Sequence, residues 1–217
     1  MKTEPLQVKR SGDFYYPIYF EEGFDSLADA IRTEGLDSRK MCIVSDTNVA
    51  PLYADSLKSA LSSVASSISL FVFEAGEKSK HLHTVQNLYE KLIESELDRK
   101  SLIVALGGGV VGDLAGFSAA TYLRGIDFIQ EPTTLLAQVD SSVGGKTGVD
   151  FNQYKNMVGA FHQPRLVYMN LQTLKSLPDT QFACGMGEVL KTGLICDGDF
   201  YHFVCEHQKT IQNLDPE

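Results

Sequence analysis

Gly107, Gly109 and Gly112 in the stretch ALGGGVVGDLAGF form a literal G-x-G-x-x-G, the spacing of a loop that can bind a phosphate group. An apolar run precedes the loop and a helix-like run follows it, so the N–H groups and positive dipole end of a helix would face the anion. Glu131, about twenty residues further on, formally completes a dinucleotide-binding fingerprint. In a standard Rossmann unit the loop follows the first strand, whereas here another strand–loop–helix unit precedes it and a proline adjoins the acid. A glycine turn without a ligand therefore remains an alternative.

A second stretch, DSSVGGKTG, carries charged groups that suit an anionic substrate. Its ending is similar to the phosphate loop of nucleotide-triphosphate-binding proteins, but that loop needs glycine where this chain has Asp140, and a strand where residues 133–139 look helical. What remains is Lys146 beside two flexible glycines, followed by Lys155 and Asn156. Two ammonium groups and an amide on loops suit a phosphorylated or carboxylated substrate, and solvated surface lysines are the alternative.

A third stretch, GMGEVLKTGLI, places Glu188 and Lys191 three residues apart, on one face of an expected helix. The ordinary interpretation is a surface ion pair between the two residues. The more specific interpretation is that Glu188 is a carboxylate ligand for a metal. None of the five histidines lies at a metal-binding spacing from Glu188. His81 and His83 fall in the first turn of an expected helix, where positions i and i+2 diverge. The four cysteines form no C-x-x-C motif, which predicts reduced and mostly buried thiols.

These groups must be positioned by elements whose pattern changes once along the chain. Strand-like runs and helical periodicities alternate up to Pro178, which predicts a parallel α/β sheet. The expected strands are in 41–44, 67–73, 101–107 and 127–132, and the expected helices are in 79–96, 113–123 and 133–142. From residue 179 to 217 the pattern predicts helices alone, too few to enclose a core of their own, so we expect the chain to be part of a longer protein.

The composition sets the class of protein. The chain has 217 residues, a hydrophobic content of 43% and a net charge of -9, which predict a globular fold and argue against broad nucleic-acid binding. Residues 101–191 are nearly neutral and hold 12 of the 18 glycines, so an anionic ligand is expected there. No apolar run has the length of a signal peptide or of a membrane span, so we expect a cytoplasmic protein without a membrane partner.

Taken together, GGGVVGDLAGFSAATYLRG, PTTLLAQVDSSVGGKTGVDFNQYKNMVGAFHQP and GMGEVLKTGLI resemble the 3-dehydroquinate synthase family of sugar-phosphate cyclases. The resemblance implies an NAD-binding α/β domain over residues 1–178 and the beginning of a helical zinc and substrate domain over 179–217. It implies a shikimate-pathway lyase that converts 3-deoxy-D-arabino-heptulosonate 7-phosphate to 3-dehydroquinate with elimination of phosphate. The implied cofactors are NAD and Zn²⁺, or another divalent cation such as Co²⁺. The glycine loop is then a pyrophosphate cradle in the topology of this family.

The resemblance also implies roles for individual residues. The positions that match the NAD site of the family are Asp46, Asn48, Glu77, Lys80, Gly109, Val110, Val111, Gly112, Asp113, Thr133, Thr134, Lys146, Lys155, Thr173, Leu174, Lys175 and Ser176. Asp140 and Lys191 match groups that hold ring hydroxyls, and the groups around the substrate phosphate match Lys146, Asn156 and Arg124. In the family the residue at Arg124 reaches across a homodimer interface. Glu188 matches one metal ligand, and the other two are histidines further along, so we expect this fragment alone to be inactive.

Three alternatives remain beside this interpretation. A sister cyclase would act on a different sugar phosphate, and the Lys155–Asn156 pair favours the dehydroquinate branch instead. The metal-dependent polyol dehydrogenases share the fold, but they typically read G-G-G-S followed by a lysine after the aspartate, where this chain has Val110 and DLAG. A non-catalytic nucleotide-binding module is favoured by the missing metal ligands. Phosphate release by the full-length gene product would separate this module from the enzyme.

Overall fold

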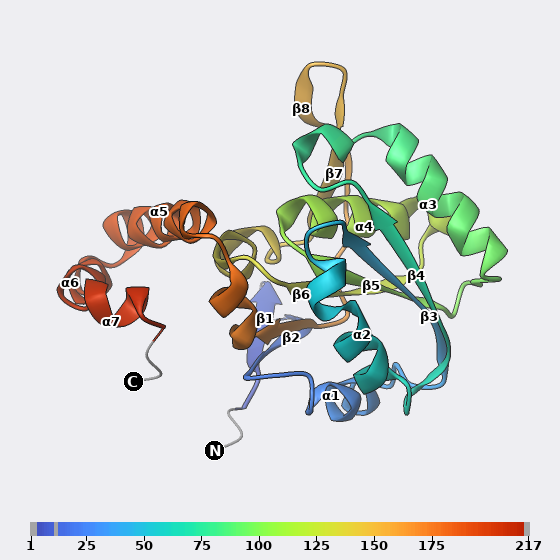
Figure 1. Cartoon of the computed structure of the whole chain (residues 1–217), viewed down its shortest axis with the longest axis horizontal. Helices are drawn as coiled ribbons and strands as arrows, with labels where there is room; N and C mark the ends of the chain where they lie inside the picture. The colour runs from blue at the N-terminus through green and yellow to red at the C-terminus, as the bar shows by residue number, and fades with distance from the viewer. Residues whose placement is uncertain (1–3, 11–12, 215–217) are drawn as a thin grey trace.

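A seven-stranded sheet forms the centre of the computed structural model, which describes residues 4–10 and 13–214 (Figure 1). Its strand order is β1-β2-β9-β6-β5-β3-β4, and every pairing except β1–β2 is parallel. The strands are β1 (Leu6–Arg10), β2 (Asp13–Glu21), β3 (Arg39–Asp46), β4 (Ala65–Phe73), β5 (Leu102–Gly107), β6 (Asp127–Pro132) and β9 (Val167–Asn170). The predicted parallel α/β fold is confirmed, while β1, β2 and β9 were not predicted.

Helices cover both faces of this sheet (Figure 1). The α-helices are α1 (Leu27–Thr33), α2 (Ala50–Leu61), α3 (Leu82–Glu94), α4 (Gly109–Thr121), α5 (Asp179–Cys196), α6 (Gly198–Glu206) and α7 (Gln208–Gln212). Short turns of other helix types are η1 (Glu77–Ser79), η2 (Tyr122–Arg124), the π-helix η3 (Ala137–Ser141) and η4 (Leu171–Ser176).

The central strand β5 is buried on both faces, as its continuous apolar run predicts. Ile103 and Ala105 pack with α3 and α4, and Val104 and Leu106 pack with α1 and α2, because successive side chains of a strand point to opposite faces. The carboxyl ends of the parallel strands therefore meet at one edge, between two layers of helices. In open α/β sheets, ligands bind at this edge.

The two predicted helices that flank the glycine loop have different starting points from those expected. α4 begins at Gly109 and not at Asp113. Gly109 and Gly112 therefore lie inside the helix, and a Cβ at Gly112 would be 2.8 Å from the Oε1 of Gln130, so the first turn packs closely on β6. α3 begins at Leu82 instead of Ser79, because η1 and an extended residue precede it.

The segment predicted as loops around Lys146 is a β-hairpin, and that prediction was wrong. β7 (Lys146–Phe151) pairs with β8 (Tyr154–Phe161) in an antiparallel sheet that projects from the α/β layers (Figure 1). Gly148 lies opposite Gly159, and an added Cβ at Gly159 would be 2.3 Å from the main-chain oxygen of Thr147. The glycines that look like loop signals thus permit close approach of two strands.

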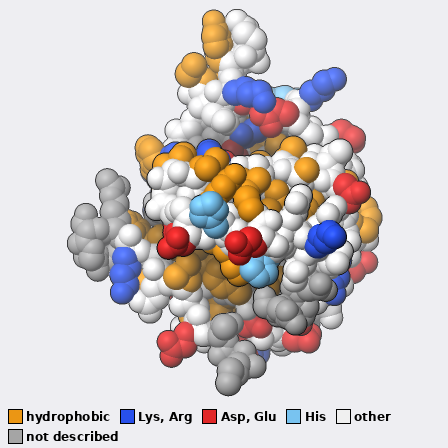
Figure 2. Space-filling view, turned by 90° about the vertical axis from the view of Figure 1, so that its left-hand side faces the viewer, with side chains coloured by type: hydrophobic (Ala, Val, Ile, Leu, Met, Phe, Trp, Pro, Cys, Tyr) orange, Lys and Arg blue, Asp and Glu red, His pale blue; other side chains and the backbone are white. Residues whose placement is uncertain are grey.

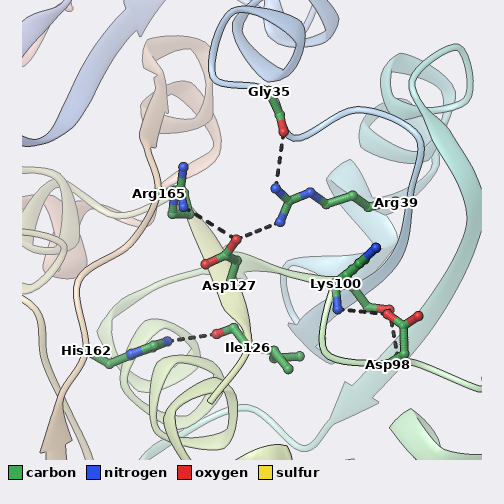
Figure 3. Close-up of polar contacts among 9 residues, drawn as sticks. Gly35, Arg39, Asp98, Lys100, Ile126, Asp127, His162 and Arg165 are labelled. Atoms are coloured by element: carbon green, nitrogen blue, oxygen red, sulfur yellow. Dashed lines mark hydrogen bonds and ion pairs between the residues drawn. The ribbon is translucent and has the colours of Figure 1, made fainter.

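The opposite edge of the sheet is fastened by charged side chains (Figure 3). Asp127, the first residue of β6, accepts a hydrogen bond from Arg39 at 2.6 Å and lies 3.7 Å from Arg165. His162, which follows β8, donates to the main-chain oxygen of Ile126 at 2.8 Å. These contacts tie the hairpin and the strands β3 and β6 together far from the glycine loop.

The chain beyond Pro178 is helical, as predicted, and α5–α7 lie to one side of the sheet (Figure 1). α5 contacts the rest where a Cβ at Gly185 would be 2.6 Å from the Cβ of Leu135. Figure 2 faces this side and shows hydrophobic side chains gathered on its surface. Three cysteines, Cys184, Cys196 and Cys205, are exposed on these helices, so the prediction of mostly buried thiols was wrong. Within the described ranges, no helix combines the length and apolar character needed to cross a membrane.

Candidate functional site

The glycine loop lies at the carboxyl edge of the sheet, between β5 and α4. Gly108, the residue just before α4, has an extended backbone. No side chain of the described residues forms a capping hydrogen bond at this end of the helix. The first N–H groups of α4 therefore lack side-chain acceptors. Together with the positive end of the helix dipole, they form a site for an anion.

The segment after β6 closes over this loop. A Cβ at Gly108 would be 3.0 Å from the Cγ2 of Thr134, and one at Gly109 would be 2.9 Å from the Oγ of Ser141. The buried hydroxyls of Thr133 and Ser141 have no hydrogen-bond partner among the residues that the structure describes. A backbone without side chains, free N–H groups and two unpaired hydroxyls together fit the pyrophosphate of a dinucleotide.

The structure thus brings together the predicted residues of the pyrophosphate loop and the two threonines after β6. The predicted set in this cradle comprises Gly109, Val110, Val111, Gly112, Asp113, Thr133 and Thr134. Sequence reasoning missed Ser141, although it directly follows the singled-out Asp140. Its unpaired hydroxyl is a tertiary property that spacing alone does not give.

Lys80 joins two other predicted site residues, which come from separate segments. It is buried, with 4% of its surface exposed, and its ammonium donates to Asp113 Oδ2 at 2.6 Å and to the Oδ1 of Asn156. Burial raises the pKa of the Asp113 carboxyl, and the neighbouring ammonium opposes that rise. Beside this network, Lys155 lies 3.2 Å from Glu77 in an exposed ion pair. Five residues expected near the cofactor or substrate therefore form one group.

A cavity of about 530 Å³ lies between η3, α4 and the hairpin. Asp113, Asp140, Lys146 and Asn156 are among its lining residues, so the structure brings the predicted substrate groups of this region to one cavity. Asp140 comes from the π-helix η3 and Lys146 from the start of β7. No carboxylate of the described residues forms an ion pair with Lys146. Its ammonium is therefore open to an anionic ligand.

Two other predicted cofactor positions support the scaffold. Asp46 Oδ1 accepts from the main-chain N–H groups of Asn48 and Val49, both at 2.9 Å, and so fixes the turn into α2. Its second carboxylate oxygen remains for a ligand such as a ribose hydroxyl. Asn48 itself is exposed beside this turn.

The predicted positions in η4 lie in different surroundings. Thr173 is buried and donates to the main-chain oxygen of Asn170 at 2.7 Å, and Ser176 hydrogen-bonds to the hydroxyl of Tyr53 at 2.5 Å. Leu174 and Lys175 line a separate cavity of about 580 Å³ against α5–α7. The structure therefore does not bring this group into the cavity that Lys146 lines.

Arg124 lies at the opposite end of α4 from the glycine loop, in η2. The 13-residue helix between them spans about 20 Å at 1.5 Å per residue. The exposed Arg124 side chain is thus remote from the glycine loop, and it does not line the cavity that Lys146 lines.

Glu188 and Lys191 form an ion pair on α5, and this pair raises the pKa of the lysine. Asp140 contributes to the same rise by its negative charge, and α5 contacts η3, the segment that carries Asp140. No group of three His, Cys, Asp or Glu side chains that could hold a metal occurs within residues 4–10 and 13–214. A metal site does not fit the described residues, which supply Glu188 alone.

The two histidines before and at the start of α3 differ from their prediction. The rings of His81 and His83 lie nearly parallel with centroids 6.2 Å apart, so the predicted divergence was wrong. His81 is the extended N-cap of α3 and not a helical residue.

Glu131 is only 2% exposed, and neither carboxyl oxygen has a hydrogen-bond partner in the described chain. Burial raises its pKa well above the ordinary value. Glu131 therefore does not present a carboxylate to a ribose.

Comparison with known proteins gives consistent matches. A family model described as 3-dehydroquinate synthase N-terminal matches residues 70–184. The 3-dehydroquinate synthase of Symbiobacterium thermophilum is 52% identical over 194 residues, covering 89% of this chain and 54% of that protein. That of Halorhodospira halophila is 47% identical over 217 residues, covering 100% and 59%. The chain spans about half the length of the curated relatives it matches.

Solved structures give the same fold. A 2-deoxy-scyllo-inosose synthase complexed with carbaglucose-6-phosphate, NAD⁺ and Co²⁺ aligns with a TM-score of 0.80 at 30% identity, covering 87% of this chain and 51% of that one. A 2-epi-5-epi-valiolone synthase from Streptomyces hygroscopicus subsp. jinggangensis with NAD⁺ and Zn²⁺ bound aligns with a TM-score of 0.80 at 27% identity, covering 94% and 56%. A glycerol dehydrogenase from Schizosaccharomyces pombe, at 17% identity and a TM-score of 0.62, shares the fold alone.

Proposed function

This chain belongs to the 3-dehydroquinate synthase family, and we propose that it forms the NAD-binding part of an enzyme with that activity. The proposed reaction converts 3-deoxy-D-arabino-heptulosonate 7-phosphate to 3-dehydroquinate and phosphate in the shikimate pathway. Residues 1–178 are the NAD-binding domain in this proposal, and residues 179–217 begin the helical domain that contributes to the substrate site. The proposed location is the cytoplasm.

The observation that carries the proposal is the convergence of Lys80, Asp113 and Asn156 beside a cavity that Lys146 also lines. The glycine loop, with the orphaned hydroxyls of Thr133 and Ser141, would hold the pyrophosphate of NAD. Bound NAD would supply reversible hydride removal from a secondary alcohol, which acidifies the neighbouring C–H and allows phosphate to leave.

The residues of this chain then have separate roles. The ammonium groups of Lys146 and Lys191 hold substrate oxygens that gain negative charge, and fixed charges in a site that excludes water stabilise such oxygens strongly. Asp140 accepts hydrogen bonds from ring hydroxyls. Asn156 donates its amide N–H groups to the phosphate, since Lys80 already occupies its Oδ1. Arg124 would complete the phosphate site of a second subunit in a homodimer.

The proposal includes a divalent metal with Glu188 as one ligand. A structural relative contains Co²⁺ and another contains Zn²⁺, each together with NAD⁺. The described residues of this chain supply one carboxylate to it, whereas a catalytic zinc normally has three protein ligands.

Phosphate release by the full-length gene product tests the proposed reaction. We expect release from 3-deoxy-D-arabino-heptulosonate 7-phosphate in the presence of NAD and a divalent metal, and formation of 3-dehydroquinate in equal amount. Glucose 6-phosphate is the matched control, because the inosose synthase relative was solved with a carba-analogue of it. Turnover of the control alone would replace the proposal with a sister cyclase, and NAD binding without turnover of either would leave a nucleotide-binding module.

A further inference from the structure

Asp150 occupies an irregular position in the β7–β8 hairpin. Val149 pairs with Val158 and Phe151 pairs with Tyr154, so one residue on β7 lies opposite three on β8. Such a bulge interrupts the hydrogen-bond ladder and leaves main-chain groups without strand partners. In the middle of these three β8 residues is Asn156, a proposed ligand of the substrate.

Asn156 has a left-handed backbone, with φ at 52°. Asparagine tolerates this region better than most residues, but the conformation still has to be maintained by neighbouring contacts. Its main-chain N–H, which no strand partner accepts, donates to the Oδ1 of Asp150 at 2.7 Å. The carboxylate of Asp150 therefore replaces the missing ladder bond at the bulge.

The main chain of Asp150 makes a second connection. Its N–H donates to the main-chain oxygen of Lys80 at 2.8 Å, and an isolated parallel bridge joins Asp150 to His81. Lys80 in turn uses its ammonium to hold Asn156 Oδ1 and Asp113. Asp150 thus fixes both the lysine backbone on one side and the asparagine backbone on the other.

We infer that Asp150 is a positioning residue, which holds Asn156 in its left-handed conformation and so aligns Asn156 with Lys80 for substrate and NAD binding. The inference rests on the proposed function for the identity of the two ligands. Asp150 touches neither ligand in this assignment. It acts through the two residues that do, because rotation of Asn156 out of the left-handed region would take its amide away from Lys80 and from the cavity.

The experiment compares four forms of the full-length gene product: the wild-type protein and the variants Asp150→Ala, Asp150→Asn and Asp98→Ala. Asparagine retains an acceptor oxygen for the N–H of Asn156, whereas alanine does not. Asp98 provides a matched control, because its Oδ1 also accepts a main-chain N–H, from Lys100 at 2.9 Å, at the opposite edge of the sheet (Figure 3).

Loss of one hydrogen bond to a charged acceptor predicts about a tenfold change in a binding constant. We expect Asp150→Ala to raise the substrate KM and the NAD Kd about tenfold each, with kcat changed less than about threefold. Asp150→Asn should restore both constants to within about twofold, and Asp98→Ala should leave both unchanged. A KM and a Kd within twofold of wild type in folded Asp150→Ala would overturn the inference, as would failure of asparagine to rescue it.

Two further measurements keep the outcome decisive. If Asp150→Ala does not fold, Asp150→Glu, which keeps the charge but moves the carboxylate one methylene further, should raise KM while the thermal unfolding midpoint stays within a few degrees; an unchanged KM would overturn the inference. If the wild-type protein binds NAD but converts no substrate, the proposed reaction fails. The positioning role is then judged by NAD Kd alone, where the same tenfold loss and asparagine rescue support it and their absence overturns it.

Discussion

The α/β region and the helical region hold their charged site residues in different ways. Lys80 in the α/β region has 4% of its surface exposed and contacts partners from two distant segments, Asp113 and Asn156. Lys191 on α5 has a side chain that is 56% exposed, and its partner Glu188 lies three residues away on the same helix. Tertiary packing fixes the first lysine, whereas helix geometry alone fixes the second pair.

The two regions also differ in how far their apolar side chains are buried. β5 is buried between two layers of helices, but Leu194, Ile195 and Phe203 on α5 and α6 are 66%, 72% and 51% exposed. Hydrophobic side chains gather on this side of the molecule (Figure 2), and large apolar patches mark surfaces that contact something else. The sheet region therefore presents a preformed glycine loop at its carboxyl edge, while the helical region contributes charges whose surroundings are incomplete among the described residues.

The largest expected effect is a loss of activity without a loss of stability when Lys191 is replaced. In the full-length gene product, Lys191→Ala should lower kcat/KM at least about 100-fold, because a removed charge contact in a closed site is worth several kcal/mol. Its free energy of unfolding should change by less than about 0.5 kcal/mol, since the Lys191 side chain is 56% exposed and pairs within its own helix. Lys209→Ala, an exposed lysine on α7, is the control. Wild-type turnover in Lys191→Ala would return the lysine to a simple surface ion pair.

Lys80 should behave in the opposite way. Lys80→Ala leaves the half-buried carboxylate of Asp113 without its ammonium partner, which should lower the free energy of unfolding by about 3 kcal/mol. Lys40→Ala removes an exposed ion pair with Glu96 and should cost less than about 0.5 kcal/mol. Urea denaturation of both variants measures the difference. Equal losses would mean that the buried ion pair of Lys80 contributes no more to stability than an exposed one.

Glu131 allows a test of burial by pH. Because burial raises its folded pKa, the folded state holds the proton more tightly than the unfolded state. The stability linked to this group is fully present below the unfolded pKa of about 4.3 and falls as pH rises toward the folded pKa. Glu131→Met, which leaves no unpaired carboxyl, should raise the free energy of unfolding at pH 7 by about 2 kcal/mol and by much less at pH 4.

The measurement for Glu131 is denaturant unfolding from pH 4 to pH 8. Glu131→Gln is the intermediate control, since it removes the charge but keeps a buried amide. An equal gain for the methionine variant at both ends of this range would show that packing, and not ionisation, explains the change.

The smallest expected effect concerns the exposed apolar face. In the 217-residue chain, Ile195→Ser should change the free energy of unfolding by less than about 0.5 kcal/mol, as surface substitutions do. Ile103→Val on β5 removes one buried methyl group and should cost about 1 kcal/mol. The same denaturation assay compares the two. A larger loss at Ile195 than at Ile103 would show that α5 is covered in solution. The two regions would then not differ in the burial of their apolar side chains.

Much of this organisation was predictable because it rests on local patterns. Single elements explain the apolar run of β5, the periodicity of α3 and the glycine spacing at the start of α4. The parallel α/β sheet follows from the alternation of strands and helices. The family resemblance supplied the site residues, and the structure places Lys80, Asp113 and Asn156 together. β1 and β9 were missed because five and four residues are too few for a period to be read, and the nine-residue strand β2 was missed as well.

The sequence by itself determined which elements form and which residue types are available for an anion, since periodicity, turn residues and glycine spacing are local properties. Only the tertiary structure decided that the glycines of β7 and β8 are strand contacts, that Glu131 is sealed in the sheet, and that Asp150 completes the bulge at Asn156. These outcomes depend on which distant groups meet and on which of them lose water. No motif spacing encodes such contacts, because they arise only when strands pair, bulge and pack in three dimensions.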